Sequence, residues 1–285
     1  MPKAYTVLTI GAPEDLSDIL KAELSLLGFN IFLDLENGAF ETAIESDSFD
    51  CAATEEIISR YGGGSAGIQM VVRHEAQQNW NTLWETHYPP VIVNDYCIVR
   101  AAFHEPMTNR LGKPYLYDLV ITPQMSFGTG HHETTSQMLA LILDLDCQGK
   151  RVADFGCGTG ILAILALKKG AALADGCDIE DWSVESAAEN AQLNGVLMRT
   201  YVGTAAECGR APGFYDLIFA NINLAVLLAE LPTYAQLLAP KGKLLLSGFY
   251  VSDIAVLQEA CRQQGLTMER QSEKNNWAAL QFKKQ

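Results

Sequence analysis

The hydrophobic positions of the first 75 residues alternate between the spacing of strands and that of helices. Tyr5 to Ile10 is rich in β-branched and aromatic residues, which predicts a strand. Leucine and isoleucine then recur at helical spacing over 16–27, and Asn37-Gly38 is a strong hairpin signal because both residues tolerate a positive φ. The resulting order of strand, helix, strand, strand, helix and strand is typical of a small ferredoxin-like α+β domain. We expect these six elements at 5–10, 16–27, 29–35, 39–44, 48–61 and 68–72.

The pattern changes after this segment. A polar, tryptophan-bearing stretch at 76–88 ends at Pro89-Pro90, and we interpret it as a helical linker. Strands are expected at 91–103 and 115–121, and from about Thr134 onward helices alternate with short apolar strands. That alternation predicts a doubly wound, mainly parallel sheet, and the last two strands predict an antiparallel C-terminal hairpin. The apolar strands are expected at 152–155, 176–179, 216–220 and 244–247, and the two strands of the hairpin at 267–270 and 277–282.

These patterns divide the chain into three parts, at 1–75, 76–90 and 91–285. The formal net charge is −14, and the first 75 residues hold thirteen Asp and Glu against four Lys and Arg. Such a surface repels phosphate backbones, so we expect no direct nucleic-acid binding. It would attract a basic partner and raise the rate of encounter. Solubility alone remains an alternative reason for the acidic balance.

The cysteines and the hydropathy indicate where the protein works. The seven cysteines are scattered, with no C-x-x-C pair, which fits free thiols in a reducing cytoplasm. No apolar run approaches the ~20 residues that a transmembrane helix needs, so we expect no membrane association. We also expect a monomer.

The clearest chemical signal is the motif Asp154-Phe155-Gly156-Cys157-Gly158-Thr159-Gly160, between an apolar strand and a helix. Glycines there let the backbone turn tightly and approach a ligand closely. A dinucleotide fingerprint needs G-x-G-x-x-G, whereas Ile161 stands where its third glycine would fall. The acidic first residue suits a cationic, phosphate-free ligand with an amino-acid end. The motif resembles the first motif of class I methyltransferases, which implies S-adenosylmethionine as cofactor, with Asp154, Gly156 and Gly158 in its site.

Two further candidates follow later strands. Asp178 ends the strand after the glycine motif, where a carboxylate faces the crevice and can accept both ribose hydroxyls. The alternative is that Asp178 caps the helix that begins near Ser183. Asn221, in Asn221-Ile222-Asn223-Leu224, stands where amino-directed methyltransferases commonly have Asn/Asp-Pro-Pro-aromatic, whose first side chain holds the target nitrogen. Both prolines are missing here, and a merely polar strand end is the alternative.

A fourth motif, Phe127-Gly128-Thr129-Gly130-His131-His132-Glu133-Thr134-Thr135, predicts a loop that opens a helix and closes over the cofactor. Adjacent histidines on one loop rarely ligate one metal ion, so we expect no metal site. The loop, the tryptophan-bearing linker, the glycine motif and Asn221 together make the chain similar to the ribosomal protein L-eleven methyltransferase family over essentially its whole length.

This resemblance implies a substrate-recognition domain at 1–75, the linker at 76–90 and an S-adenosylmethionine-binding domain at 91–285. It implies cofactor contacts from Phe127, Thr135, Gly156, Asp178 and Asn221. It also implies that lysine side chains and the N-terminal amine of the L-eleven protein accept the methyl groups. As a mechanism we expect in-line transfer to a neutral amine that Asn221 orients.

Other interpretations remain open from the sequence. No committed general base is evident; His131 and His132 are candidates, and a structural role in the loop is the alternative. A methyltransferase that acts on another protein or on a small molecule would keep its activity without residues 1–75. A non-catalytic binding module with the same fold would require a degraded glycine motif or the loss of Asp178, and both are intact.

Overall fold

The computed structural model describes residues 4–25, 27–29, 31–35, 38–62, 68–76, 89–122 and 133–285. Tertiary contacts divide the chain into two compact units, Met1–Pro89 and Pro90–Gln285. Residues 77–88 of the expected linker lie outside the described residues, so its helical character stays a prediction.

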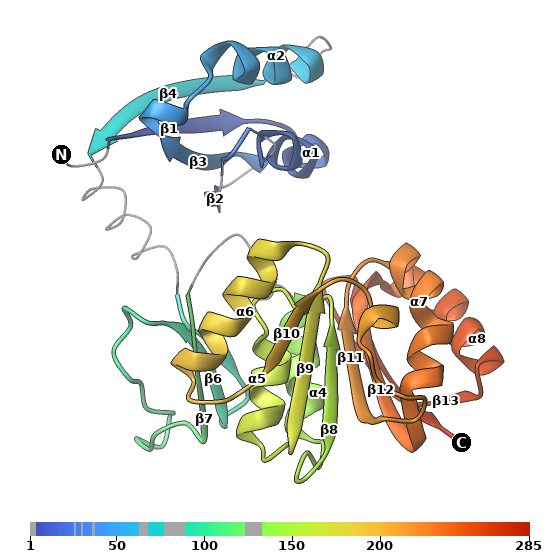
Figure 1. Ribbon diagram of the computed structural model, residues 1–285. Coiled ribbons are helices and arrows are strands. Elements are labelled where there is room, and N and C mark those ends of the chain that lie inside the picture. Colours follow the sequence, from blue (N-terminus) through green and yellow to red (C-terminus); the bar gives the residue numbers. More distant parts are fainter. Residues whose placement is uncertain are drawn as a thin grey trace. The chain divides into compact units, whose positions relative to one another are not determined.

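The first unit is a four-stranded antiparallel sheet with two helices (Figure 1). Its strand order is β2-β3-β1-β4, so the first and third strands lie side by side in the middle. Leu8 and Ile10 of the central strand are fully buried with Leu20 and Leu24 of the first helix, as the alternating pattern requires. The small α+β domain is therefore confirmed. Its elements are β1 (Ala4–Gly11), α1 (Glu14–Ser25), β2 (Ile31–Asp34), β3 (Phe40–Glu45), α2 (Cys51–Gly62) and β4 (Gln69–Ala76).

The second unit begins with a separate three-stranded sheet of β5 (Val91–Val93), β6 (Cys97–Ala101) and β7 (Tyr117–Ile121). The expectation of one strand over 91–103 was wrong. Asn94 has a φ of 57° and begins a turn, so β5 and β6 pair as an antiparallel hairpin. An asparagine tolerates this left-handed conformation better than a β-branched residue such as Val93.

The main sheet has seven strands in the order β10-β9-β8-β11-β12-β14-β13. The first five run parallel, and β14 pairs antiparallel with both β12 and β13. The doubly wound sheet and its antiparallel C-terminal hairpin are thus confirmed. The strands are β8 (Arg151–Phe155), β9 (Leu173–Asp178), β10 (Arg199–Val202), β11 (Tyr215–Asn221), β12 (Leu238–Tyr250), β13 (Leu266–Lys274) and β14 (Trp277–Lys284).

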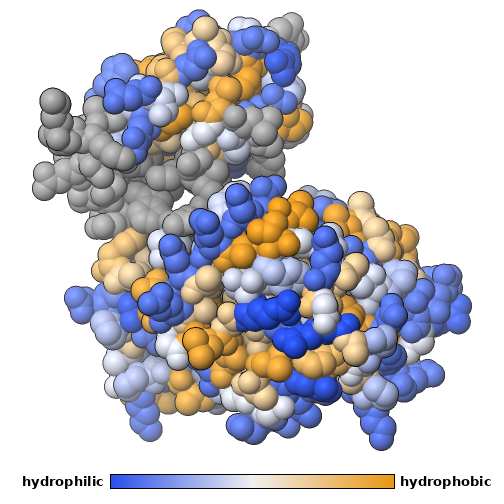
Figure 2. Space-filling view, in the orientation of Figure 1, coloured by the Kyte–Doolittle hydropathy of each residue, from blue (hydrophilic) through white to orange (hydrophobic). Residues whose placement is uncertain are grey.

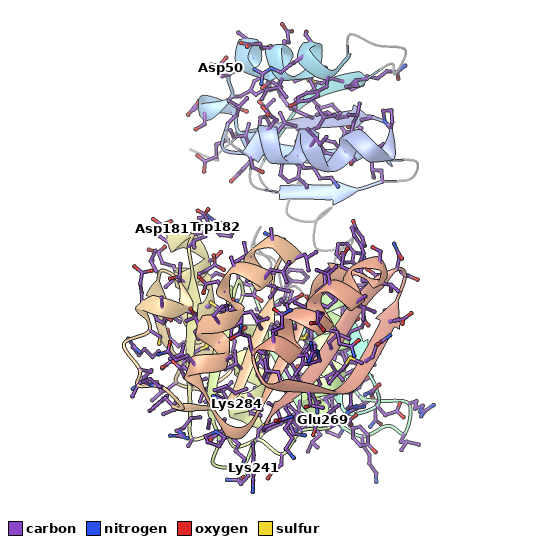
Figure 3. The ribbon with its side chains drawn as sticks, turned by 90° about the vertical axis from the view of Figure 1, so that its right-hand side faces the viewer. Asp50, Asp181, Trp182, Lys241, Glu269 and Lys284 are labelled. Carbon is purple, nitrogen blue, oxygen red and sulfur yellow. The ribbon has the colours of Figure 1, made fainter. Side chains whose placement is uncertain are left out.

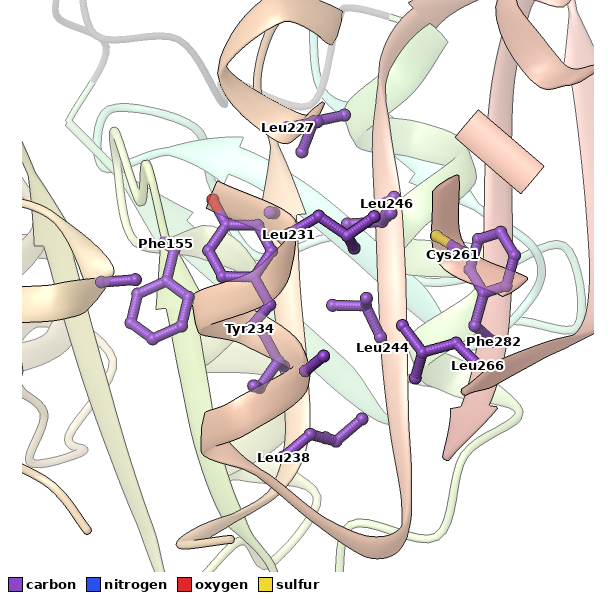
Figure 4. Close-up of a cluster of buried hydrophobic side chains, with 14 of the residues drawn as sticks. Phe155, Leu227, Leu231, Tyr234, Leu238, Leu244, Leu246, Cys261, Leu266 and Phe282 are labelled. Atoms are coloured by element: carbon purple, nitrogen blue, oxygen red, sulfur yellow. The ribbon is translucent and has the colours of Figure 1, made fainter. Parts of the chain in front are cut away.

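Helices cover both faces of this sheet. On one face α4 packs against α5 and α5 against α6, and on the other α7 packs against α8. Figure 4 shows the core under α7 and α8, where Phe155 stacks on Tyr234 with ring centroids 5.3 Å apart. Because side chains alternate along a strand, Phe155 faces this core while its neighbour Asp154 faces α5. The helices are α4 (Glu133–Leu143), α5 (Ile161–Lys168), α6 (Asp181–Leu193), α7 (Leu224–Leu237) and α8 (Ile254–Gln263).

The two ends of the parallel strands lie at opposite ends of the unit. Asp181 and Trp182, which follow the carboxyl end of β9, lie at one end, and Lys241, near the start of β12, lies at the other (Figure 3). Hydrophilic residues and smaller apolar patches alternate over the face seen in Figure 2. Within the described ranges, no helix is both long and apolar enough to cross a membrane.

Candidate active site

The glycine turn between β8 and α5 holds three glycines in the left-handed region, with φ of 71° at Gly156, 52° at Gly158 and 74° at Gly160. The N–H groups of Gly156 and Cys157 both donate to the Cys177 carbonyl at 2.8 Å, which fixes the turn against β9. A Cβ at Gly156 would lie 2.2 Å from Cγ2 of Ile222. Backbone conformation and close approach therefore both require glycine at this position.

Asp154 is buried to 1% exposure beneath this turn. Its Oδ2 accepts the N–H of Ala163 at 3.1 Å, in the first turn of α5, where the N-cap residue Gly160 has no side chain to do so. Its Oδ1 is buried without a hydrogen-bond partner among the described residues. Burial raises the pKa of the Asp154 carboxyl to about 8, and the Asp178 charge adds to the rise. The site thus holds a buried carboxyl oxygen that a cationic ligand could pair.

Asp178 lies at the carboxyl end of β9 and is oriented by two backbone groups. Its Oδ2 accepts the N–H of Gly158 at 3.0 Å, and its Oδ1 accepts the N–H of Glu180 at 3.2 Å. The alternative role as a helix cap is wrong, because α6 begins at Asp181 with Glu180 as its N-cap residue. Each carboxylate oxygen keeps a lone pair for a further donor, so Asp178 remains able to accept hydrogen bonds from hydroxyl groups.

Asn221 ends β11, and only one end of its side-chain amide has a hydrogen-bond partner among the described residues. Its Nδ2 donates to Oγ1 of Thr135, 86 positions earlier, at 3.3 Å. Its Oδ1 is buried and accepts no hydrogen bond within the described part of the chain. The second asparagine of the motif has a different task, since the Asn223 side chain caps α7 by accepting the N–H of Val226 at 3.1 Å. Asn221 therefore holds a buried acceptor oxygen that no described residue uses.

These contacts bring most of the expected site residues together at one edge of the sheet. Thr135 contacts Asn221, the neighbouring Ile222 closes on Gly156, and Gly158 contacts Asp178. The ends of β8, β9 and β11 are adjacent because the sheet order places β8 between the other two. Phe127, His131 and His132 lie outside the described residues, so their roles stay predictions. Among the described residues no group of three or more His, Cys, Asp or Glu could hold a metal ion.

Comparisons with known proteins identify the family. The family model for ribosomal protein L11 methyltransferase (PrmA) matches residues 36–285. Proteins named ribosomal protein L11 methyltransferase from Phocaeicola vulgatus and Porphyromonas gingivalis are 36% and 40% identical, over 97% and 98% of this chain and 97% and 96% of their own. The chain belongs to this family.

A solved structure agrees with that assignment. The crystal structure of ribosomal protein L11 methylase from Lactobacillus delbrueckii subsp. bulgaricus superposes with a TM-score of 0.61 at 25% identity. The match covers 69% of this chain and 98% of that one. The family member described here is thus an S-adenosylmethionine-dependent methyltransferase of the class I fold.

The geometry of the site fits that cofactor. S-adenosylmethionine has a sulfonium, an ammonium and a ribose, and it lacks phosphate. The unpartnered oxygens of Asp154 and Asn221 suit positive or hydrogen-bond-donating groups, and the Asp178 carboxylate suits hydroxyls. The glycine turn leaves the backbone open to close approach. Which atom each residue contacts stays a prediction.

Reasoning from the sequence missed one polar residue beside this site. Asn190 is fully buried in α6 and contacts the glycine turn. The available signal was a large polar residue on a helix face that is otherwise made of small residues such as Ser186 and Ala187.

Proposed function

We propose that this protein transfers methyl groups from S-adenosylmethionine to lysine side chains and to the N-terminal amine of ribosomal protein L11. The supporting observation is the buried acceptor oxygen of Asn221 at the carboxyl end of β11, unpartnered among the described residues, in a chain whose named relatives align over nearly its whole length. The cofactor, when bound, supplies an electrophilic methyl group on its sulfonium. The protein's own residues then have to hold the acceptor amine in line with that group.

The acceptor must reach the site without its proton. A lysine amine has a reference pKa of about 10.4, so only about one in 10³ is neutral at pH 7. In this proposal Oδ1 of Asn221 accepts an N–H of the neutral amine, which aims its lone pair away from Asn221. Thr135 sets the direction of that oxygen, because its Oγ1 accepts the Nδ2 group at 3.3 Å. Fixing two reactants in this way supplies much of the rate of a bimolecular transfer.

The substrate-recognition role of the first 75 residues is part of the same proposal. Its support is the excess of acidic residues there, which suits a basic ribosomal protein. Exposed acidic side chains of this unit include Asp47, Asp50, Glu55 and Glu56, and Figure 3 shows Asp50 at the surface. We also propose that the protein acts as a monomer in the cytoplasm and makes no direct contact with nucleic acid.

The test is a transfer assay with methyl-labelled S-adenosylmethionine and purified ribosomal proteins, resolved by mass. We expect label on L11 at lysine and N-terminal amines, and none with the Asp178→Ala variant. Label on a different ribosomal protein would keep the reaction and change the partner. Cofactor binding without label on any ribosomal protein would overturn the proposed substrate.

A further inference from the structure

Asn190 uses its whole side-chain amide inside the protein. It lies on α6 with 0% of its surface exposed. Its Nδ2 donates to the Thr159 carbonyl at 3.1 Å and to Oγ of Ser186 at 3.4 Å, and its Oδ1 accepts the N–H of Thr122 at 2.8 Å. One side chain thus joins three parts of the chain. They are the glycine turn, 31 positions away, the segment after β7, 68 positions away, and its own helix. A buried amide with all its contacts made holds its partners in one arrangement.

Asn194, one turn later on the same face of α6, makes a related contact. Its Oδ1 accepts the N–H of Val120 at 3.0 Å, and its Nδ2 donates to the Val120 carbonyl at 2.5 Å and to the Asn190 carbonyl at 2.8 Å. Val120 lies in β7, which is an edge strand of its sheet, and Thr122 follows directly after that strand. The two asparagines therefore attach the three-stranded sheet to the helix that follows β9.

Only Asn190 of this pair also contacts the glycine turn. Thr159 stands between Gly158, whose N–H orients the Asp178 carboxylate, and Gly160, the N-cap residue of α5. Three glycines at positive φ give this turn little intrinsic preference for one conformation. A hydrogen bond from a buried side chain to the Thr159 carbonyl, in the middle of the turn, is thus a direct means of selecting one conformation of the turn.

We propose that Asn190 is a positioning residue for cofactor binding, which holds the Thr159 carbonyl and thereby the Gly158 N–H in the arrangement that orients Asp178. This inference rests on the proposed function, and it adds a residue that need not contact the cofactor. A purely structural role would instead make Asn190 equivalent to Asn194, which binds Val120, two positions before Thr122, and has no hydrogen bond to the glycine turn among the described residues.

The experiment compares Asn190→Asp with the matched control Asn194→Asp in the full-length protein. Each change replaces an amide that donates to a backbone carbonyl by a carboxylate that repels it, and only the first acts on the glycine turn. The dissociation constant of S-adenosylmethionine is measured by calorimetry at pH 6 and pH 9, relative to wild type at the same pH. The midpoint of urea unfolding is measured in parallel to record the loss of stability in each variant.

We expect Asn190→Asp to weaken cofactor binding on the order of tenfold at pH 9 and Asn194→Asp by less than about twofold, a tenfold change being ~1.4 kcal/mol. At pH 6 the binding of Asn190→Asp should return toward wild type. Burial raises the pKa of the introduced carboxyl, and its protonated form can again donate to the Thr159 carbonyl. Equal cofactor affinities for the two variants at both pH values would overturn the inference.

A second variant covers the case in which Asn190→Asp does not fold. Asn190→Ser removes the contact with Thr159 without introducing a charge, and Asn194→Ser is its control. Weaker cofactor binding by the first alone supports the inference, and equal binding by both overturns it. If wild type itself bound no S-adenosylmethionine, the proposed function would fail together with the inference. If wild type bound S-adenosylmethionine and the two variants bound it with equal affinity, only the inference would be overturned.

Discussion

Asp154 has a carboxyl group whose two oxygens lie in different surroundings. One accepts the N–H of Ala163 at the start of α5, and the other is buried with no partner among the described residues. Burial outweighs the hydrogen bond and raises the pKa of the group from 3.8 to about 8. The free enzyme therefore keeps a proton on Asp154 at neutral pH, and a cationic ligand would favour its release.

That shift predicts a pH-dependent stability of the ligand-free protein. Between about pH 4 and pH 8 the unfolded chain has lost the Asp154 proton while the folded protein keeps it, so the free energy of unfolding falls as the pH rises. In Asp154→Asn this contribution is absent. We expect the stability of wild type relative to the variant to fall by at most about 1.4 kcal/mol per pH unit over this range. Urea unfolding at pH 5, 6.5 and 8 measures this difference. If the free energies of unfolding of both proteins changed in parallel with pH, the pKa of Asp154 would be that of an ordinary carboxyl group.

Asn221 offers a prediction about turnover. Asn221→Ala removes the acceptor proposed to orient the amine, and a misplaced acceptor amine costs on the order of 10²-fold in rate. We expect kcat to fall by about that factor and the dissociation constant of S-adenosylmethionine to change much less. Asn223→Ala is the matched control, because it removes only the cap of α7 and about 1 kcal/mol of stability. Equal losses of turnover and cofactor binding in Asn221→Ala would make Asn221 a cofactor ligand and remove its orienting role.

At the scale of the elements, the tight fit between the glycine turn and the end of β11 can be tested. An alanine at position 156 would have to adopt a φ of 71°, and its Cβ would lie 2.2 Å from Cγ2 of Ile222. Gly156→Ala should therefore displace either the turn or the segment that holds Asn221. Gly112→Ala is the control, with a φ of 70° and nothing within 4 Å.

We expect the control to cost about 1–2 kcal/mol of stability and Gly156→Ala to cost more. Only Gly156→Ala should also weaken cofactor binding. Urea unfolding and calorimetry measure the two effects. If both variants lost the same stability and the same cofactor affinity, the idea of a tight fit would be refuted.

The same elements show what the sequence could predict. The apolar strands were found because buried parallel strands are short apolar runs, and their mainly parallel arrangement followed from their alternation with helices. β10 was missed because its four residues are half-buried or exposed and show no apolar run. The hairpin of β5 and β6 was missed because apolar residues flank Asn94-Asp95 on both sides, and the positive φ of Asn94 cannot be read from that pattern.

The site was predicted in part for a related reason. Asp178 and Asn221 could be placed because the carboxyl ends of parallel strands share one edge of the sheet. The partner of Asn221 could not be foreseen, since no periodicity links Thr135 to a residue 86 positions away. The contact of Asn190 with Thr159 is equally non-local. Hydropathy places elements and strand ends, and side-chain contacts between distant segments require the folded structure.

At the scale of the whole molecule, the charge predicts how a basic partner is recruited. The net charge is −14, and thirteen acidic residues fall within the first 75. Some of these are already paired, such as Glu41 with Arg73 and Glu23 with Arg60. Asp47 and Glu55 are exposed and form no ion pair among the described residues, so they remain available to steer a basic protein.

We therefore expect the KM for the basic substrate protein to rise several-fold between 50 mM and 300 mM salt, while kcat stays constant, because salt screens exposed charges and leaves the buried site unaffected. Asp47→Asn with Glu55→Gln should raise KM at low salt and flatten its salt dependence. Initial rates with saturating S-adenosylmethionine measure both constants. A lysine-containing peptide with zero net charge is the control, since its KM should not respond to salt. If the KM of the protein substrate were equally insensitive, the acidic surface would serve solubility alone.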